Sequence, residues 1–423
     1  MPSIRPLPAA IRLSLILFVL VATLGAARHS AAAQLAPAPH AASRPYPCEP
    51  FVPRVAPGTP GARGAARTPM VYVKASNTEQ YDNFGVSLAV DGDTMVVSSQ
   101  FEDSAATGVN GDQSSNSGYF PGAAYVFVRT NGVWTQQAYL KASNTEVDDN
   151  FGASVAIAGD TIVVGAPGED SAATGSGGDQ LNNATLNAGA AYVFVRTGTT
   201  WTQQAYLKAS NPSEADTFGD QVAVDGDTIV VGAWREDSAA TGIGGDQLNN
   251  AAANAGAAYV FVRTGTAWSQ QAYLKAANTQ QTVSDTPPSP FGFGDLFGSA
   301  VAVSGDRIVV GAVAEDGDSA GISDPLDADV IAQSGAVYVF NRHGTVWSHP
   351  TMVKASNPSP QGNFGVAVGL SGELIMASAF CESSGATDID GNQRDTSAPG
   401  SGAAYVFHIP EYTMHMPRLQ VAR

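Results

Sequence analysis

The chain has 423 residues, of which 44% are hydrophobic, and it carries 21 basic and 38 acidic side chains for a formal net charge of −17. No basic groove with interleaved aromatic residues is visible, and an acidic surface repels phosphates, so nucleic acid is excluded as a partner. Net charge alone bears on solubility and repulsion, and it selects no fold.

Residues 1–33 have the pattern of a signal peptide. Arg5 and Arg12 make a positive start, residues 13–24 are apolar, and small residues near Ala27 or at residues 31–33 supply cleavage sites. A membrane-spanning helix needs about 20 apolar residues, so this stretch is short for a membrane anchor. We therefore expect a secreted or cell-surface protein with no transmembrane segment beyond the signal. An uncleaved anchor is the alternative.

Residues 34–69 are rich in Ala, Pro, Gly and Arg and have no apolar period. This composition predicts a flexible, disordered linker. Its basic residues outnumber its single acid, Glu49. We expect an inert spacer, with attachment to a cell wall or anionic polymer as the alternative.

From residue 70 onward the chain contains one sequence unit that is repeated five times. A Phe-Gly pair opens each unit near residues 84, 151, 218, 297 and 364, so the spacings are 67, 67, 79 and 67. An aromatic strand begins 40 residues after each Phe, and a Trp follows at offset 50 in four units. The fourth unit is longer because 12 residues are inserted between Ala277 and Phe297. A fixed period of this kind indicates a repeat architecture.

Each unit predicts four short strands, A to D, and no helix. In the second unit they cover residues 154–158, 161–166, 191–196 and 201–209, and Gly-containing turns join A to B and C to D. Radial repetition protects the open edges of such sheets. We therefore predict an all-β fold, a β-propeller of five four-stranded blades over residues 70–410. A linear β-solenoid is the competing repeat fold.

The two ends of the repeat region suggest how the ring closes. Residues 70–77 match strand D, while the last unit has a degenerate fourth strand in the tail, residues 411–423, which contains Pro417. We expect the N-terminal strand to pair with the last blade; the alternative is that the tail makes its own strand D. Closure would bring Cys48 and Cys381 into one region, where an exported chain can form a disulfide. Two unrelated cysteines are the alternative.

These repeats resemble the FG-GAP repeat of integrin α-chains and bacterial surface proteins. The likeness is carried by the Phe151-Gly152 pair and by the Gly165-Ala166-Pro167 tripeptide, and it runs from about residue 70 to the C-terminus. The resemblance implies a propeller that mediates adhesion through a loop face, assisted by calcium. Integrin-type propellers have seven blades, and their calcium loop lies between strands A and B. Here that connection is only a few residues long, so the calcium site does not carry over.

Acidic residues concentrate at one predicted end of the sheets. Of the 37 acids after residue 70, 29 fall in the B–C and D–A connections. The B–C loops of four units start with an acidic pair, and with Trp234 these make our ligand-binding candidates: Glu102, Asp103, Glu169, Asp170, Glu236, Asp237, Glu315 and Asp316.

Calcium is the candidate ion for these loops, and no other cofactor is predicted. Calcium takes six to eight oxygen ligands, and one B–C loop spaces oxygen-bearing side chains closely at Asp388, Asp390, Asn392 and Asp395. The alternative is that the acids only solvate a secreted surface.

The sequence gives no sign of an enzyme. Its histidines are scattered, and the carboxylate pairs recur in each unit, whereas a catalytic pair needs asymmetric environments. We expect the repeated Trp residues to pack between blades. The prediction is a non-enzymatic protein that binds an extracellular protein or glycan, in an oligomeric state that the sequence does not specify. A propeller lyase or hydrolase is the runner-up, and a structural envelope protein is third.

Overall fold

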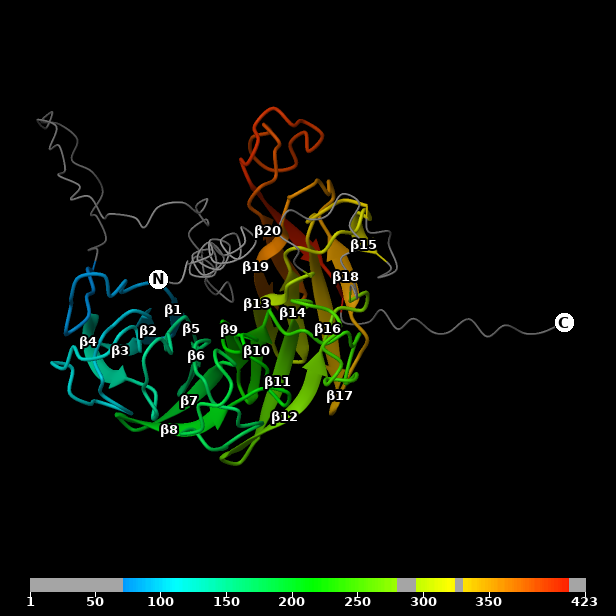
Figure 1. Ribbon diagram of the computed structural model, residues 1–423. Coiled ribbons are helices and arrows are strands. Elements are labelled where there is room, and N and C mark those ends of the chain that lie inside the picture. The colour runs from blue at the N-terminus through cyan, green and yellow to red at the C-terminus, as the bar shows by residue number, and fades with distance from the viewer. Residues whose placement is uncertain (1–70, 280–293, 324–329, 411–423) are drawn as a thin grey trace, which may run out of the picture. The chain divides into compact units, whose positions relative to one another are not determined.

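The structure is a computed structural model that describes residues 71–279, 294–323 and 330–410. Contacts divide the chain into two compact units, residues 1–28 with 38–75, and residues 29–37 with 76–423. Every strand belongs to the second unit, and the described residues form an all-β fold of five antiparallel sheets (Figure 1). None of the described segments is a helix long and apolar enough to cross a membrane.

The first three sheets each contain four strands in sequence order. The first is β1 (Leu88–Asp91), β2 (Thr94–Ser99), β3 (Ala123–Thr130) and β4 (Val133–Leu140). The second is β5 (Ser154–Ala158), β6 (Thr161–Ala166), β7 (Ala190–Thr197) and β8 (Thr200–Leu207). The third is β9 (Gln221–Asp225), β10 (Thr228–Ala233), β11 (Ala257–Thr264) and β12 (Ala267–Leu274). The strands predicted from the repeat are confirmed to within two residues.

In the fourth sheet the last strand is broken. Its strands are β13 (Phe297–Ser304), β14 (Arg307–Ala312), β15 (Gly321–Ser323), β16 (Ala336–His343), β17 (Val346–Trp347) and β18 (Thr351–Lys354). The position of strand D is divided between β17 and β18, and Pro350 lies in the break, where it has no N–H to offer the ladder. β15 is an extra strand from the B–C loop that pairs with β18.

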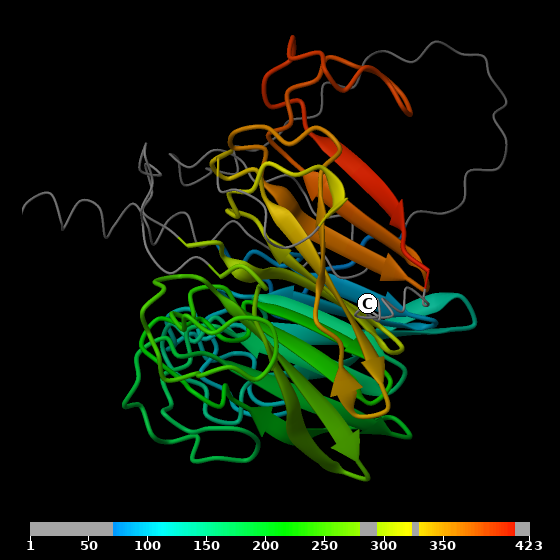
Figure 2. The ribbon, with the colours of Figure 1, turned by 90° about the vertical axis from the view of Figure 1, so that its right-hand side faces the viewer.

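The fifth sheet has three strands among the described residues. They are β19 (Phe364–Ser371), β20 (Leu374–Ala379) and β21 (Ala403–His408). β21 pairs only with β20 and lies at the edge of this sheet, drawn red in Figure 2. Residues 71–77 form no strand in the structure, and the pairing of the N-terminal strand with this sheet stays a prediction.

The hydrophobic core lies between consecutive sheets. The first strands of neighbouring sheets lie beside one another, β1 by β5, β5 by β9, β9 by β13 and β13 by β19. One cluster joins Val126 and Leu140 of the first sheet to Val155, Ile162 and Tyr192 of the second. Three similar clusters follow along the chain, so each sheet is stabilised by burial against its neighbours.

The Phe-Gly pair and the Gly near the end of strand B lie where neighbouring sheets come closest. Phe151 is buried edge-on against Tyr192, and Gly152 adopts a φ of 97° that side chains rarely tolerate. A Cβ atom on Gly165 would lie 1.8 Å from the carbonyl oxygen of Gly219 in the next sheet. Glycine is therefore needed at these positions, because the backbones of two sheets lie so close together that no side chain fits between them.

Candidate functional site

A buried carboxylate occupies the start of each B–C loop. Glu169 is 1% exposed, and its Oε2 lies 2.7 Å from Nζ of Lys208 at the end of strand D. Its Oε1 accepts hydrogen bonds from Tyr206 at 2.6 Å and from Asn144 of the preceding sheet at 3.0 Å. The carboxylate is therefore fully partnered, and it ties the loop to two sheets.

The same arrangement recurs in the other complete sheets. The equivalent ion pairs are Lys141–Glu102, Lys275–Glu236 and Lys354–Glu315. Burial lowers the pKa of Lys141, Lys208 and Lys275, and the paired glutamate acts in the opposite direction.

The prediction of these glutamates as ligand contacts is wrong. Glu102, Glu169, Glu236 and Glu315 are each 1% exposed, so an outside ligand does not reach them. The lysine partner was not predicted, because it lies 39 residues after each glutamate in the sequence. That constant offset is a signal that could have found the pair.

The second acid of each pair holds the base of its loop together. Oδ1 of Asp170 accepts a hydrogen bond of 2.7 Å from the backbone N–H of Asn187, 17 residues later. Asp103, Asp237 and Asp316 bond in the same way to Phe120, Asn254 and Gln333. Each of these half-buried aspartates stabilises the base of its own loop. The acidic pairs therefore do not form the expected binding surface.

The repeated Trp residues lock neighbouring sheets together. Trp201 is 2% exposed, and its indole N–H donates a 2.8 Å hydrogen bond to Oε1 of Gln137 in the preceding sheet. The β3–β4 register shifts at this position and leaves Gln137 without a paired residue on β3. Its side chain can therefore reach Trp201. Arg196 stacks over the Trp201 ring at 5.1 Å and donates to Thr94 of the preceding sheet at 3.0 Å. The expected packing role of the Trp series agrees with this burial.

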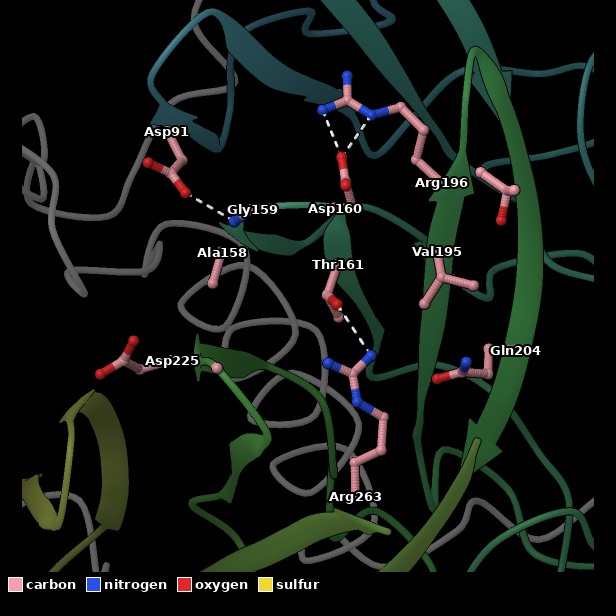
Figure 3. A pocket seen from close by; sticks show the side chains of 12 residues that line it. Asp91, Ala158, Gly159, Asp160, Thr161, Val195, Arg196, Gln204, Asp225 and Arg263 are labelled. Carbon is pink, nitrogen blue, oxygen red and sulfur yellow. Dashed lines mark hydrogen bonds and ion pairs between the residues drawn. The ribbon is translucent and has the colours of Figure 1, made fainter. Parts of the chain in front are cut away.

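A hollow of about 550 Å³ lies at the A–B turns of the first three sheets (Figure 3). Asp91 accepts a 2.6 Å hydrogen bond from the N–H of Gly159, and Arg196 pairs with Asp160. Arg263 donates to Thr161 at 3.1 Å. Asp91 and Arg263 thus hold one sheet to the next, while Asp160 and Arg196 pair within the second sheet.

A second hollow, of about 420 Å³, lies between the second and third sheets beside the B–C loops. We call it the amide cleft; it is lined by Thr174, Gly175, Ser210, Ile243, Gly244, Gln247, Gln270, Gln271, Ala272 and Tyr273. Ser210 Oγ donates to Gln247 and accepts a 2.9 Å hydrogen bond from Gln270. The lining contains no charged side chain, and it offers both donors and acceptors.

The hydrogen bonds around Ser210 recur one repeat earlier. There, Ser143 Oγ donates to Gln180 and accepts a 2.9 Å hydrogen bond from Gln203. An exposed leucine follows each loop glutamine in sequence, Leu181 at 79% and Leu248 at 86%.

The remaining ligand-binding candidate, Trp234, is half-buried. Arg235 stacks over its ring at 4.4 Å, and the ring packs on a buried cluster that contains Leu296, Val313 and Ala314. Much of this side chain is therefore used in packing within the fold.

The structure does not gather the residues predicted to bind calcium. Asp388, Asp390 and Asn392 are exposed, and both Asp395 carboxylate oxygens accept hydrogen bonds from Ser397. Across the described ranges, no group of three or more His, Cys, Asp or Glu side chains could hold a metal ion. The calcium site stays a prediction.

Cys381, which follows β20, is half-buried. Its predicted disulfide partner, Cys48, lies outside the described residues, as do the signal peptide, the linker, the insertion at 280–293 and the tail.

Four aspartates of the D–A loops are buried, Asp82, Asp149, Asp216 and Asp295, and the sequence analysis did not single them out. Asp149 is 3% exposed and Asp216 is 1% exposed. Burial raises the pKa of Asp149 to about 7 and that of Asp216 to about 8. Oδ1 of Asp216 is buried without a hydrogen-bond partner among the described atoms, a position that suits a protonated carboxyl group.

Comparison with known proteins bears on the family. A search of curated proteins finds no match to the chain. Residues 70–127, 134–194 and 201–261 match the family model of the FG-GAP repeat. Each matched stretch begins at a strand D position and ends within strand C of the following sheet. The chain therefore contains three FG-GAP repeats.

Proposed function

We propose that this protein is a secreted or cell-surface, propeller-like, non-enzymatic binding protein whose ligand is an uncharged glycan held in the repeated amide clefts. FG-GAP repeats are typical of extracellular proteins, and the sequence predicts a signal peptide. The ligand surface is then formed by the amide and hydroxyl groups beside the acidic pairs, because the acidic pairs themselves are used inside the fold.

The chemistry of the cleft carries this proposal. Sugar hydroxyl groups both donate and accept hydrogen bonds, and Gln247, Gln270 and Ser210 offer both kinds of group. Clefts with few, well-placed polar groups are the usual form of small-ligand sites. Since the lining is uncharged while the chain is strongly acidic, a neutral ligand fits better than an anionic polymer.

Repetition supports a repeating ligand. The same Ser and Gln hydrogen bonds occur at Ser143, Gln180 and Gln203, so one chain presents this set of polar groups more than once. Linked weak sites raise the overall affinity for a ligand that spans them. An uncharged polysaccharide or a glycan-bearing surface protein has this property.

We further propose that the sheets are the blades of a five-bladed ring, with calcium as an assisting ion on the loop that contains Asp388 and Asp390. Four copies of one buried carboxylate–lysine pattern suit an architectural role, since catalysis requires asymmetric surroundings.

A glycan array with the full chain tests this function, followed by titration of the best glycan in buffer with calcium and with chelator. We expect Gln247→Ala to weaken binding at least about 5-fold, since a polar contact is lost. Gln393→Ala is the matched control, because Gln393 makes the same bond to a loop serine, Ser356, in the fifth sheet, where no fourth strand is described. No bound glycan, or equal losses in the two variants, would refute the amide cleft; unchanged binding in chelator would remove calcium.

A further inference from the structure

A lysine, a glutamate and an asparagine meet in one buried network at the second sheet. Glu169 and Lys208 are at most 1% exposed, and Asn144 is 7% exposed. Lys208 Nζ lies 2.7 Å from Oε2 of Glu169, and Asn144 Nδ2 donates to Oε1 of the same carboxylate at 3.0 Å. One carboxylate therefore bridges a primary amine and a primary amide that lie far apart in the sequence.

The side-chain amide of Asn144 is held by all of its polar atoms. Besides the bond to Glu169, its Nδ2 donates to the carbonyl oxygen of Gln180 at 2.9 Å. Its Oδ1 accepts a 2.6 Å hydrogen bond from the hydroxyl group of Tyr192, which is fully buried. The orientation of the amide is therefore fixed, and a donor polarises its carbonyl group.

These contacts suit the transfer of the amide carbonyl from its own nitrogen to the lysine amine. Burial lowers the pKa of Lys208, which favours the uncharged amine that acts as a nucleophile. Glu169 faces the amine through one oxygen and the amide nitrogen through the other, so it can take a proton from the first and give one to the second. The Tyr192 hydroxyl donates to the oxygen on which negative charge develops.

We propose that Lys208 and Asn144 form an intramolecular isopeptide bond, with Glu169 as the acid–base group. Nζ of the uncharged amine bonds to Cγ of Asn144, the Cγ–Nδ2 bond breaks, and ammonia leaves. The proton that Nζ loses passes through Glu169 to the departing nitrogen, so the step needs no oxidant and no cofactor. The product links the loop between β4 and β5 to the residue that follows β8, and it joins two consecutive sheets covalently.

The same network recurs at three other sheets. In each, the asparagine donates to the glutamate, the glutamate pairs with the lysine, and a tyrosine donates to the asparagine oxygen. The sets are Asn77–Glu102–Lys141–Tyr125, Asn211–Glu236–Lys275–Tyr259 and Asn278–Glu315–Lys354–Tyr338. We expect one isopeptide bond in each set.

The fifth sheet provides an internal control. Asn357 donates to Glu382 at 2.9 Å and accepts a 2.6 Å hydrogen bond from Tyr405. Among the described residues, however, Glu382 has no lysine partner. This set has the amide, the carboxylate and the hydroxyl group without the nucleophile, so Asn357 should stay unlinked.

Mass spectrometry of the full chain tests the proposal without any glycan, so its outcome is independent of the amide cleft. Each bond removes one molecule of ammonia, and the protein should be lighter than its sequence from the observed N-terminus by four of them. Trypsin should leave a branched peptide that joins Lys208 to Asn144. Separate peptides with unmodified Lys208 and Asn144 would overturn the proposal, and the same criterion applies to each other set. Loss of water with Lys208 joined to Glu169 would also overturn it, because the carboxylate would then be the acyl donor.

Two variants test the assigned roles. Lys208→Arg keeps a positive charge beside Glu169 but removes the amine, and Glu169→Gln removes the group that transfers the proton. Each should leave Asn144 unlinked and keep the other three bonds, so the mass deficit shrinks by one ammonia. Lys74→Arg changes an exposed lysine outside the sets and should keep the full deficit. A bond at Lys208 that persists in Glu169→Gln would contradict the role of Glu169. The unchanged protein gives the primary result, so the test does not depend on how well a variant folds.

Discussion

At the scale of single residues, the acids of this chain have two separate uses. Glu169 is buried with Lys208 as an ion pair, and removing one partner of such a pair typically costs about 3–5 kcal/mol. Asp170 instead closes the base of its loop through a backbone hydrogen bond. Adjacent carboxylates therefore behave differently because the strand and loop geometry points one inward and the other along the loop.

Buried aspartates give the protein a predictable pH dependence. The pKa of Asp149 is raised to about 7 and that of Asp216 to about 8, both mainly by burial, from an unfolded value of about 3.9. Between these values the folded state holds protons that the unfolded state has released. The stability from this effect is therefore complete below about pH 4 and is lost as the pH rises to about 8.

Thermal unfolding at pH 5 and pH 8 checks this effect. Asp216→Asn should reduce the fall in melting temperature between the two pH values, because the amide cannot ionise. Glu214→Gln changes an exposed acid two residues away and serves as the control. An equal fall in the Asp216→Asn variant and the unchanged protein would contradict the raised pKa.

At the scale of strands and turns, the repeat period predicted most of what is found. The offset between Phe151 and the aromatic strand placed β7 correctly, because a fixed period marks the same element in each unit. The shift in the β7–β8 register, which directs Gln204 toward Trp268, has no local sequence signature. The Glu169–Lys208 pair was missed because residues far apart in sequence meet only once the sheet has formed.

Close backbone contact between sheets makes one glycine of the motif especially sensitive. A Cβ on Gly165 would lie 1.8 Å from the Gly219 carbonyl oxygen, and backbone on both sides cannot give way easily. We expect Gly165→Ala to destabilise the protein by about 1–3 kcal/mol or more, as overpacking does. Urea unfolding measures the loss.

Gly369 in β19 provides the matched control for this change. Its added Cβ would meet only Met376 at 3.7 Å, which is an ordinary contact. Gly369→Ala should therefore unfold at nearly the same urea concentration as the unchanged protein. Similar midpoints for the two variants would show that the sheets are not in close contact at Gly165.

At the scale of the whole molecule, stability is shared between neighbours because each core cluster belongs to two sheets. Ile229 of β10 is fully buried in the cluster that also contains Val163 and Leu207 of the second sheet. In such a repeat array, weakening one interface loosens the sheets on both sides of it, and the effect falls with distance along the array.

Ile229→Ala should therefore speed hydrogen exchange in β5–β8 and β9–β12 together, with a smaller change in β19–β21. Val133→Ala, an exposed position on β4, is the control and should leave all five sheets unchanged. Faster exchange confined to β9–β12 would mean that each sheet is stable by itself, contrary to a core placed between sheets.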